Sequence, residues 1–269
     1  MPQLSLPDGT RIAYDEYNFT PPWTSPSTVI LVHGFNKNRR FWWDWIPALA
    51  RHYRLISLDQ RGHGESSLPP QDFVMGLEPF ADDLVAVLDK LGIDSATFVM
   101  AEFSSSVAID LASRYPDRVR SLVLPGFGYN WQASKTVNWN AWADIAEREG
   151  TEVWSRQTTR FRLPADADPA LSEWYTMQQA RMPGWLLAKV FRFVGQTDLS
   201  ARLDAVKVPA LIIAGSESQQ DTLESMRKGV AKMARAELVV LQGAPFNVMN
   251  ARPTECVAAT LEFLGRNGR

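Results

Sequence analysis

The sequence has very few cysteine and histidine residues. Its single cysteine, Cys256, cannot form a disulfide within one chain, and no cluster of Cys and His residues offers ligands for zinc. We therefore expect no metal site, and no cofactor is predicted. Cys256 lies in an apolar stretch typical of the buried face of a helix, so we expect its thiol to be structural.

Long hydrophobic runs and an excess of one charge are also missing. No apolar run approaches the roughly 20 residues that span a bilayer, and residues 1–8 lack the basic and apolar segments of a secretion signal. The 28 Lys and Arg residues nearly balance the 30 Asp and Glu residues, so no basic stripe is available to bind phosphates. These absences predict a cytoplasmic protein that binds neither a membrane nor nucleic acid.

The chain is long and rich in hydrophobic and aromatic residues. It contains 269 residues, of which 45% are hydrophobic and ten are Trp. A chain of this length buries roughly three quarters of the surface that its unfolded state exposes, so one large α/β domain or two small ones can fold without disulfides. The sequence leaves open whether the protein is a monomer or a homodimer.

Short strand-like runs alternate with amphipathic helical stretches along most of the chain. This alternation predicts an α/β fold with a doubly wound, mostly parallel sheet. An N-terminal hairpin over residues 2–19, with an Asp-Gly turn, is expected at the sheet edge. Helices are expected over residues 80–91 and 107–115. The six further strands are expected at residues 28–32, 53–58, 96–100, 119–124, 211–214 and 237–241.

The alternation breaks between about residues 128 and 200. No strand-like run occurs there, and six of the ten Trp residues fall in this segment. The strand pattern resumes at Val208, so the segment interrupts the sheet rather than following it. We predict a helical cap, or lid, over residues 129–199, inserted into a core domain formed by residues 1–128 and 200–269.

Three segments of the chain carry a family resemblance. They read VILVHGF at residues 29–35, DQRGHGES at residues 59–66 and LASRYPDRV at residues 111–119. In this order they resemble the capped α/β-hydrolase superfamily over nearly the whole chain. The resemblance implies that the His-Gly turn after the strand at 28–32 presents the backbone N–H of Phe35 to an oxyanion.

The resemblance also implies where a catalytic nucleophile should stand. Family members place it on a sharp strand-to-helix turn, about 14 residues before the Pro of the Tyr-Pro-x-Arg-Val segment. That position is Glu102, with Met100 and Ser104 in place of the glycines that usually flank it. A slip that puts Ser104 at the turn is the alternative, but it would place Glu102 where its side chain should clash.

The other two catalytic positions of the family also differ. Phe246 replaces the histidine that usually follows the last strand, and Ser218 stands at the position of the acid. Asp221 or Glu217 could reach the site only through an altered loop. No histidine follows residue 63, so a Ser-His-Asp triad cannot be assembled in the usual chain order. The three histidines are His33, His52 and His63.

Loss of the triad disfavours ordinary ester hydrolysis, because its members act as a unit. An ester formed on Glu102 would persist without a histidine to activate water. We therefore predict a non-hydrolytic lyase, isomerase or cyclase in which Glu102 is the general acid or base. The backbone N–H groups of Phe35 and Phe103 would bind an oxyanion. A helix N-terminus favours the carboxylate and an apolar pocket the neutral acid, so the protonation state stays open.

Aromatic residues of the loop after His33 and of the predicted cap indicate the ligand. Such surfaces suit an apolar, aromatic or polycyclic small molecule with a few polar groups. Each Trp taken singly is better explained by packing of the cap, so only a few of them are expected to touch ligand. The predicted contacts are His33, Trp42, Tyr129, Trp131, Trp139, Trp142, Tyr175, Trp185 and Phe246.

Two other functions stay open at this point. The chain could be a non-catalytic small-molecule binding protein that has lost the triad and kept the pocket. It could also be a residual ester or C–C hydrolase with a rearranged site that uses Ser104 or a displaced acid. A long ionisable side chain at a tight, buried turn is costly, which favours a functional Glu102 over a merely tolerated one.

Overall fold

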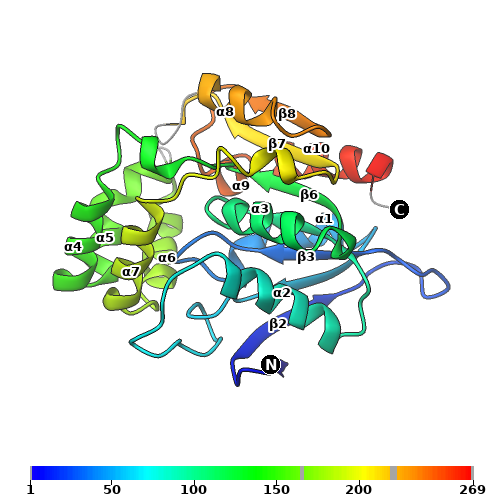
Figure 1. The fold of residues 1–269 in the computed structure, drawn as a ribbon, viewed down its shortest axis with the longest axis horizontal. Coiled ribbons are helices and arrows are strands. Elements are labelled where there is room, and N and C mark those ends of the chain that lie inside the picture. Colours follow the sequence, from blue (N-terminus) through cyan, green and yellow to red (C-terminus); the bar gives the residue numbers. More distant parts are fainter. Residues whose placement is uncertain (1, 164–166, 219–222, 268–269) are drawn as a thin grey trace.

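The computed structural model describes residues 2–163, 167–218 and 223–267 of the chain. Within these ranges, eight strands form one sheet in the order β1-β2-β4-β3-β5-β6-β7-β8. The pairs β1/β2 and β2/β4 are antiparallel and the others are parallel, which confirms the predicted doubly wound, mostly parallel sheet (Figure 1). The strands are β1 (Gln3–Ser5), β2 (Arg11–Tyr17), β3 (Thr28–Val32), β4 (Arg54–Leu58), β5 (Ala96–Met100), β6 (Val119–Pro125), β7 (Ala210–Gly215) and β8 (Ala236–Leu241).

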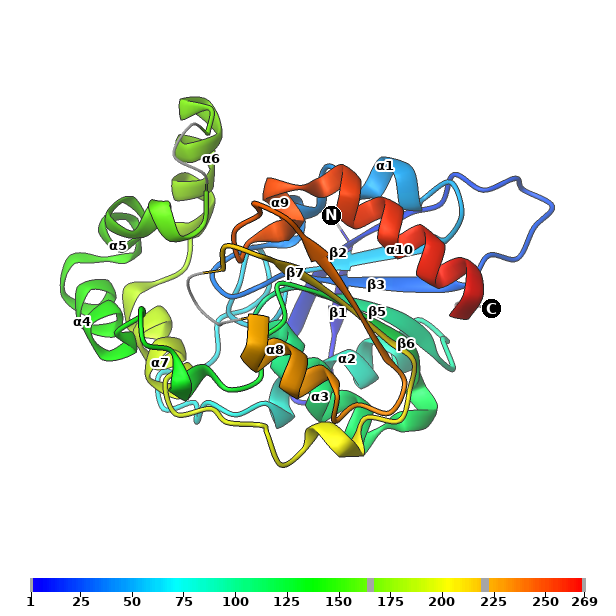
Figure 2. The ribbon, with the colours of Figure 1, turned by 90° about the horizontal axis from the view of Figure 1, so that it is seen from above.

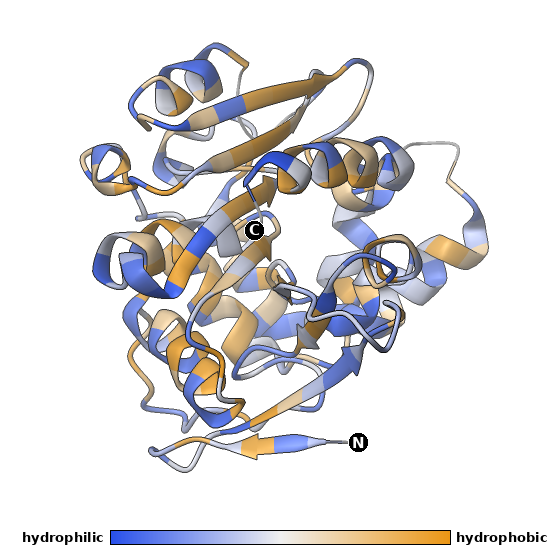
Figure 3. Cartoon of the chain, turned by 90° about the vertical axis from the view of Figure 1, so that its right-hand side faces the viewer, coloured by the Kyte–Doolittle hydropathy of each residue, from blue (hydrophilic) through white to orange (hydrophobic). Residues whose placement is uncertain are grey.

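The central strands are apolar on both faces because helices cover both sides of the sheet. Every residue of β3, β5 and β7 is buried. Along β3, Ile30 packs into the apolar cluster on one face and Leu31 into the cluster on the other. Figure 3 shows hydrophobic residues concentrated along the strands. A continuous apolar run therefore marks the strands that are covered on both faces.

Two layers of helices enclose the sheet (Figure 2). Helices α2 (Glu78–Lys90), α3 (Ser104–Arg114) and α8 (Leu223–Val230) cover one face. Helices α1 (Ile46–Leu49), α9 (Val248–Ala251) and α10 (Pro253–Asn267) cover the other. Cys256 is buried on α10, as expected, and burial raises the pKa of its thiol to about 12. No helix in the described ranges is long and apolar enough to cross a membrane.

In the part of the chain that the structure describes, four helices are inserted between β6 and β7, and they lie to one side of the molecule (Figure 1). They are α4 (Trp139–Glu149), α5 (Thr151–Thr158), α6 (Pro169–Gln179) and α7 (Gly184–Val194). Trp154 and Phe191 are part of the small apolar core that this insertion contributes. The predicted cap at residues 129–199 contains these helices, and its status as a separate lid domain stays a prediction. Short 3-10 helices span Arg39–Trp42, Pro116–Arg118, Trp131–Ala133, Thr159–Phe161 and Leu203–Ala205.

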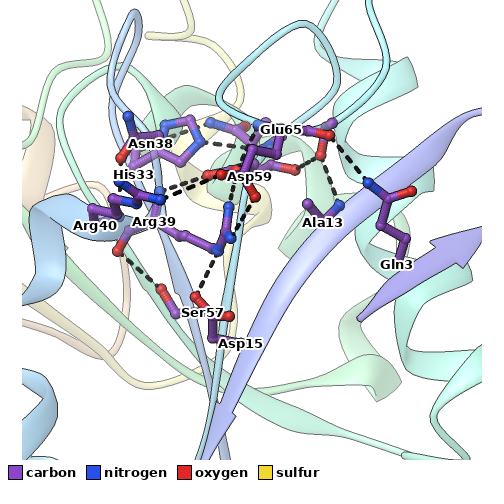
Figure 4. Close-up of polar contacts among 12 residues, drawn as sticks. Gln3, Ala13, Asp15, His33, Asn38, Arg39, Arg40, Ser57, Asp59 and Glu65 are labelled. Carbon is purple, nitrogen blue, oxygen red and sulfur yellow. Dashed lines mark hydrogen bonds and ion pairs between the residues drawn. The ribbon is translucent and has the colours of Figure 1, made fainter. Parts of the chain in front are cut away.

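Arg39 fixes the loop that follows β3. Its guanidinium is almost fully buried and forms ion pairs with Asp59, with Asp15 at 2.6 Å and with Glu65 at 2.9 Å (Figure 4). The backbone N–H of Arg39 also donates to Asp59 Oδ1 at 2.7 Å. The guanidinium holds the pKa of Glu65 below its usual range. The loop after β3 is thereby tied to β2 and to the loop after β4.

We expect Arg39→Met to lower the free energy of unfolding by about 3–5 kcal/mol, because Asp59 would become a buried carboxylate without its cation. Arg40→Met is the matched control, since the Arg40 side chain is 48% exposed, and it should cost less than about 1 kcal/mol. Urea denaturation followed by circular dichroism measures both values. Equal losses in the two variants would contradict the role given to Arg39.

Candidate active site

Glu102 occupies the turn between β5 and α3. Its φ of 55° lies in the left-handed region, and its N–H donates to Pro125 O at 2.9 Å. A side chain on Gly34 would collide with the Glu102 carboxylate, and one on Gly126 would lie 3.3 Å from Glu102 Cγ. Both glycines therefore leave room for Glu102. A strained non-glycine residue between a strand and a helix is typical of a functional site.

Ser104 does not stand at this turn. It begins α3, and its fully buried Oγ donates to His33 O at 2.6 Å and accepts from Gln60 Nε2 at 3.0 Å. A hydroxyl held in this way is unavailable to attack a ligand. These hydrogen bonds give no support to Ser104 as the nucleophile of a residual hydrolase.

Lys37 is the partner of the Glu102 carboxylate. Its side chain comes from the loop after β3, is 1% exposed and forms an ion pair with Glu102 Oε1. Its Nζ also donates to Asn247 Oδ1 at 2.7 Å and to Asn250 Oδ1 at 3.5 Å. Burial lowers the pKa of Lys37, and the Glu102 carboxylate opposes that shift. Loops after three different strands thus meet at one buried ammonium group.

The hydrogen bonds of the two asparagines fix which amide atom faces Lys37. Asn247 Nδ2 donates to Arg162 O at 3.1 Å, and Asn250 Nδ2 donates to Phe41 O at 2.9 Å. Because carbonyl oxygens only accept, these contacts orient both amides with Oδ1 toward Lys37. An ammonium group has three N–H bonds, one for each of the three acceptors around Nζ. The contacts therefore match an ion pair of the Lys37 ammonium with the Glu102 carboxylate.

A cavity of about 510 Å³, its open mouth included, lies in front of Glu102. Phe35 and Phe103 stack beside the carboxylate with ring centroids 3.9 Å apart, and both line the cavity. Within the described ranges, neither of their backbone N–H groups has an acceptor. Those two amides are free to bind an oxyanion, the role predicted for them. The other aromatic lining residues are Trp131, Trp139, Trp142, Trp154, Phe191 and Phe246.

Four of the predicted ligand contacts reach this cavity. Trp131, Trp139 and Trp142 line its wall. Phe246 lies next to Glu102, since a side chain on Gly126 would contact both residues. Neither Ser218 nor Glu217 lines the cavity, and Asp221 lies outside the described residues.

The remaining predicted contacts are corrected because each side chain is held elsewhere. His33 is fully buried, with Nδ1 2.7 Å from Gly34 O and Nε2 3.1 Å from the N–H of Gln60, and burial lowers its pKa to about 3. Trp42 is fully buried against Trp45. Both residues belong to the packing of the loops beneath the cavity.

The other three corrections concern residues of the insertion and its approach. The hydroxyl of Tyr129 donates to Ser225 O at 2.9 Å, which turns the ring away from the cavity lining. Trp185 packs within the core of the insertion. Tyr175 lies one layer behind the cavity, where its hydroxyl contacts the side chains of Asn247 and Asn250.

Sequence reasoning missed Lys37, Asn247, Asn250, Arg162 and Trp154. Lys37 belongs to no repeating pattern, and only the fold brings it to Glu102. The sequence does contain a pattern that could have identified the two asparagines. They stand three residues apart just after Phe246, and this spacing places both side chains on one side of a helical turn. Among the described residues, no group of His, Cys, Asp and Glu side chains is arranged to hold a metal ion.

A family model described as alpha/beta hydrolase fold matches residues 27–249. Bifunctional epoxide hydrolase 2 of Sus scrofa is 35% identical over 118 residues, which cover 42% of this chain and 20% of that protein. The chain thus spans about a fifth of the length of that relative. The 3-oxoadipate enol-lactonase 2 of Acinetobacter baylyi is 23% identical over 219 residues, 80% of each chain.

A solved structure shares the fold over nearly the full length. The enol-lactonase from Burkholderia xenovorans LB400 superimposes with a TM-score of 0.86 at 21% identity, covering 98% of this chain and 100% of that one. At this identity the likeness describes the fold.

We expect Lys37→Met to destabilise the fold by about 3–5 kcal/mol, because it leaves Glu102 as a partly buried carboxylate without its cation. Adding Glu102→Gln should recover part of that loss, with a coupling of at least about 1 kcal/mol between the two substitutions. Urea denaturation of the wild type, both single variants and the double variant completes the cycle. Additive losses would show that the two side chains do not form the pair described here.

Proposed function

The chain belongs to the α/β-hydrolase family, and from this premise we propose that it is an enzyme in which the Glu102 carboxylate acts as a general base. The observation that carries the proposal is the ion pair with Lys37, which keeps a carboxylate at the turn where family members hold a nucleophile. The ligand is an apolar, aromatic or polycyclic small molecule, in keeping with the Trp-lined cavity. The reaction is an elimination, isomerisation or cyclisation.

The proposed reaction begins with a carbon acid. A C–H group next to a carbonyl lies over Glu102, whose carboxylate accepts the proton while the C–H electrons move onto the carbonyl oxygen. The N–H groups of Phe35 and Phe103 stabilise the resulting enolate. In an elimination, the enolate expels a leaving group from the adjacent carbon, and the leaving group takes the proton from Glu102. In an isomerisation, the enolate takes the proton back from Glu102 at a different carbon.

Lys37 has a supporting role in this proposal. Its ammonium lies behind the carboxylate and is 1% exposed, so it does not reach the ligand. It keeps Glu102 ionised before the reaction and so makes it a base rather than an acid. Phe246 beside Glu102 offers no second proton carrier, so Glu102 itself must deliver the proton to the leaving group or back to the product.

The hydrolase names of the relatives favour a second candidate function. Glu102 could take a proton from water, and the water would then attack an activated ester whose oxyanion is held by the same two amides. This route needs no covalent intermediate and therefore no histidine to resolve one. A non-catalytic binding protein is the third possibility, and it predicts no turnover by either route.

Two chromogenic probes separate these functions. Wild-type protein should accelerate ring opening of 5-nitrobenzisoxazole, in which a base removes the C–H proton, the N–O bond breaks and a phenolate forms. Glu102→Gln should slow this reaction about 10²–10⁴-fold, because the base is lost. Glu217→Gln, which removes an exposed carboxylate, should keep the wild-type rate. Hydrolysis of p-nitrophenyl acetate is measured in parallel.

The outcomes differ for each function. Hydrolysis that depends on Glu102, without ring opening, would replace the proposal with the water-activating candidate. Rates that are equal in the wild type and in Glu102→Gln for both probes would reject the base. If quenching of Trp fluorescence then still reported binding of the probes, a binding protein would remain.

A further inference from the structure

Arg162 is a buried cation that the proposed reaction does not use. It follows the 3-10 helix Thr159–Phe161, lines the cavity and is 8% exposed. Its Nη1 donates to Thr158 Oγ1 at 2.8 Å and its Nη2 to Ser155 O at 2.7 Å. The guanidinium carbon lies 4.5 Å from the ring centroid of Trp154. These contacts hold the group in place but leave its Nε without an acceptor among the described residues.

No carboxylate in the described ranges neutralises this cation. The groups whose charge acts on it are the Tyr175 hydroxyl and Glu102, and Glu102 is already the ion-pair partner of Lys37. Desolvation lowers the pKa of Arg162 to about 10, so the group is still charged at neutral pH. Among the described residues, Lys37 and Glu102 cancel, and Arg162 remains as a positive charge of the cavity lining without a counter-ion. A buried charge without a counter-ion is unfavourable unless a ligand supplies one.

Two more donors of the cavity lining lack acceptors. They are Trp154 Nε1 and Asn36 Nδ2, both buried. Ser155 Oγ donates to Gln179 Oε1 at 2.7 Å, and Gln179 Nε2 donates to Asn36 Oδ1 at 2.9 Å. With the two amides in these orientations, the nitrogen of the Asn36 amide has no acceptor among the described residues. Each cavity-lining side chain in the described ranges with an unpaired buried polar atom thus carries a donor, and none carries an acceptor.

We propose that Arg162, with Asn36 and Trp154, binds a carboxylate of the ligand. A guanidinium of the cavity lining without a counter-ion among the described residues matches an anionic group, and a carboxylate is the planar anion that its N–H groups bind in pairs. The ligands of this cavity are therefore flat aromatic or polycyclic carboxylic acids. The inference names the substrate class of the proposed reaction and rests on that proposal only for the chemistry at Glu102, because binding of the anion does not need the base.

Binding of a matched pair of ligands tests this assignment. Isothermal titration calorimetry with 1-naphthoate and naphthalene-1-carboxamide compares an anion with a neutral molecule of the same shape. Wild-type protein should bind the naphthoate about ten- to hundredfold more tightly, as expected for hydrogen bonds to a charged group. Arg162→Met should remove this preference. Arg160→Met, which removes an exposed arginine two residues away, should keep it.

Several outcomes would overturn the assignment. It fails if the wild type binds both ligands equally, a result that does not depend on whether any variant folds. It also fails if folded Arg162→Met keeps the preference. If Arg162→Met does not fold, Arg162→Lys is used instead. This variant retains the charge and should keep part of the preference for the naphthoate. No preference in Arg162→Lys would count against a charge-based site. Naphthalene-1-sulfonate is the third ligand, and tighter binding of it than of the naphthoate would reassign the site to another oxygen acid.

The test also separates this inference from the proposed function. Glu102→Gln removes the base but leaves Arg162 unchanged, so it should still bind 1-naphthoate more tightly than the carboxamide. A loss of ring opening without a loss of this preference supports both proposals. A preference that persists where ring opening never occurs leaves the anion site standing and rejects the base alone.

Discussion

The buried ion pair between Lys37 and Glu102 is the interaction on which the site depends. A carboxylate at a tight turn against an apolar cavity is unfavourable unless a cation accompanies it. Lys37 supplies that cation. The side-chain oxygens of Asn247 and Asn250 accept hydrogen bonds from its other two N–H groups. All three partners follow the carboxyl ends of strands, so they meet only when the parallel sheet has formed. The Lys37–Glu102 pair therefore depends on the folding of the whole core rather than on one local motif.

The rest of the core places the loops that carry this pair. Arg39 ties the loop after β3 to β2 and to the loop after β4 through buried ion pairs, two residues beyond Lys37. Gly34 and Gly126 leave the space that the Glu102 side chain fills. Stability and function are coupled here, because the contacts that hold the loop also fix the distance between the ammonium and the carboxylate.

The strands follow from local patterns in the sequence, because apolar runs mark β3, β5 and β7. The position of Glu102 follows from the family resemblance, which implies the spacing between the turn before α3 and the Tyr-Pro segment. The partners of Glu102 do not follow, since Lys37 reaches it only through the tertiary fold. The aromatic residues that line the cavity could not all be predicted, for a related reason. Trp42 and Trp154 look alike in sequence, and only the packing around each decides that Trp42 is core and Trp154 lines the cavity.

Charge balance within the cavity joins the two proposals. In a hydrolase relay, a histidine carries the proton from the nucleophile to the leaving group. Here Phe246 stands beside Glu102, and Lys37 already holds three protons, so a proton taken by Glu102 has no second carrier. Protonation of Glu102 would leave two positive charges uncompensated, Lys37 behind the carboxyl group and Arg162 in the cavity wall. A bound carboxylate and a developing enolate are the two negative charges that would balance them. An anionic ligand therefore makes the proton transfer to Glu102 electrostatically more favourable than a neutral ligand would.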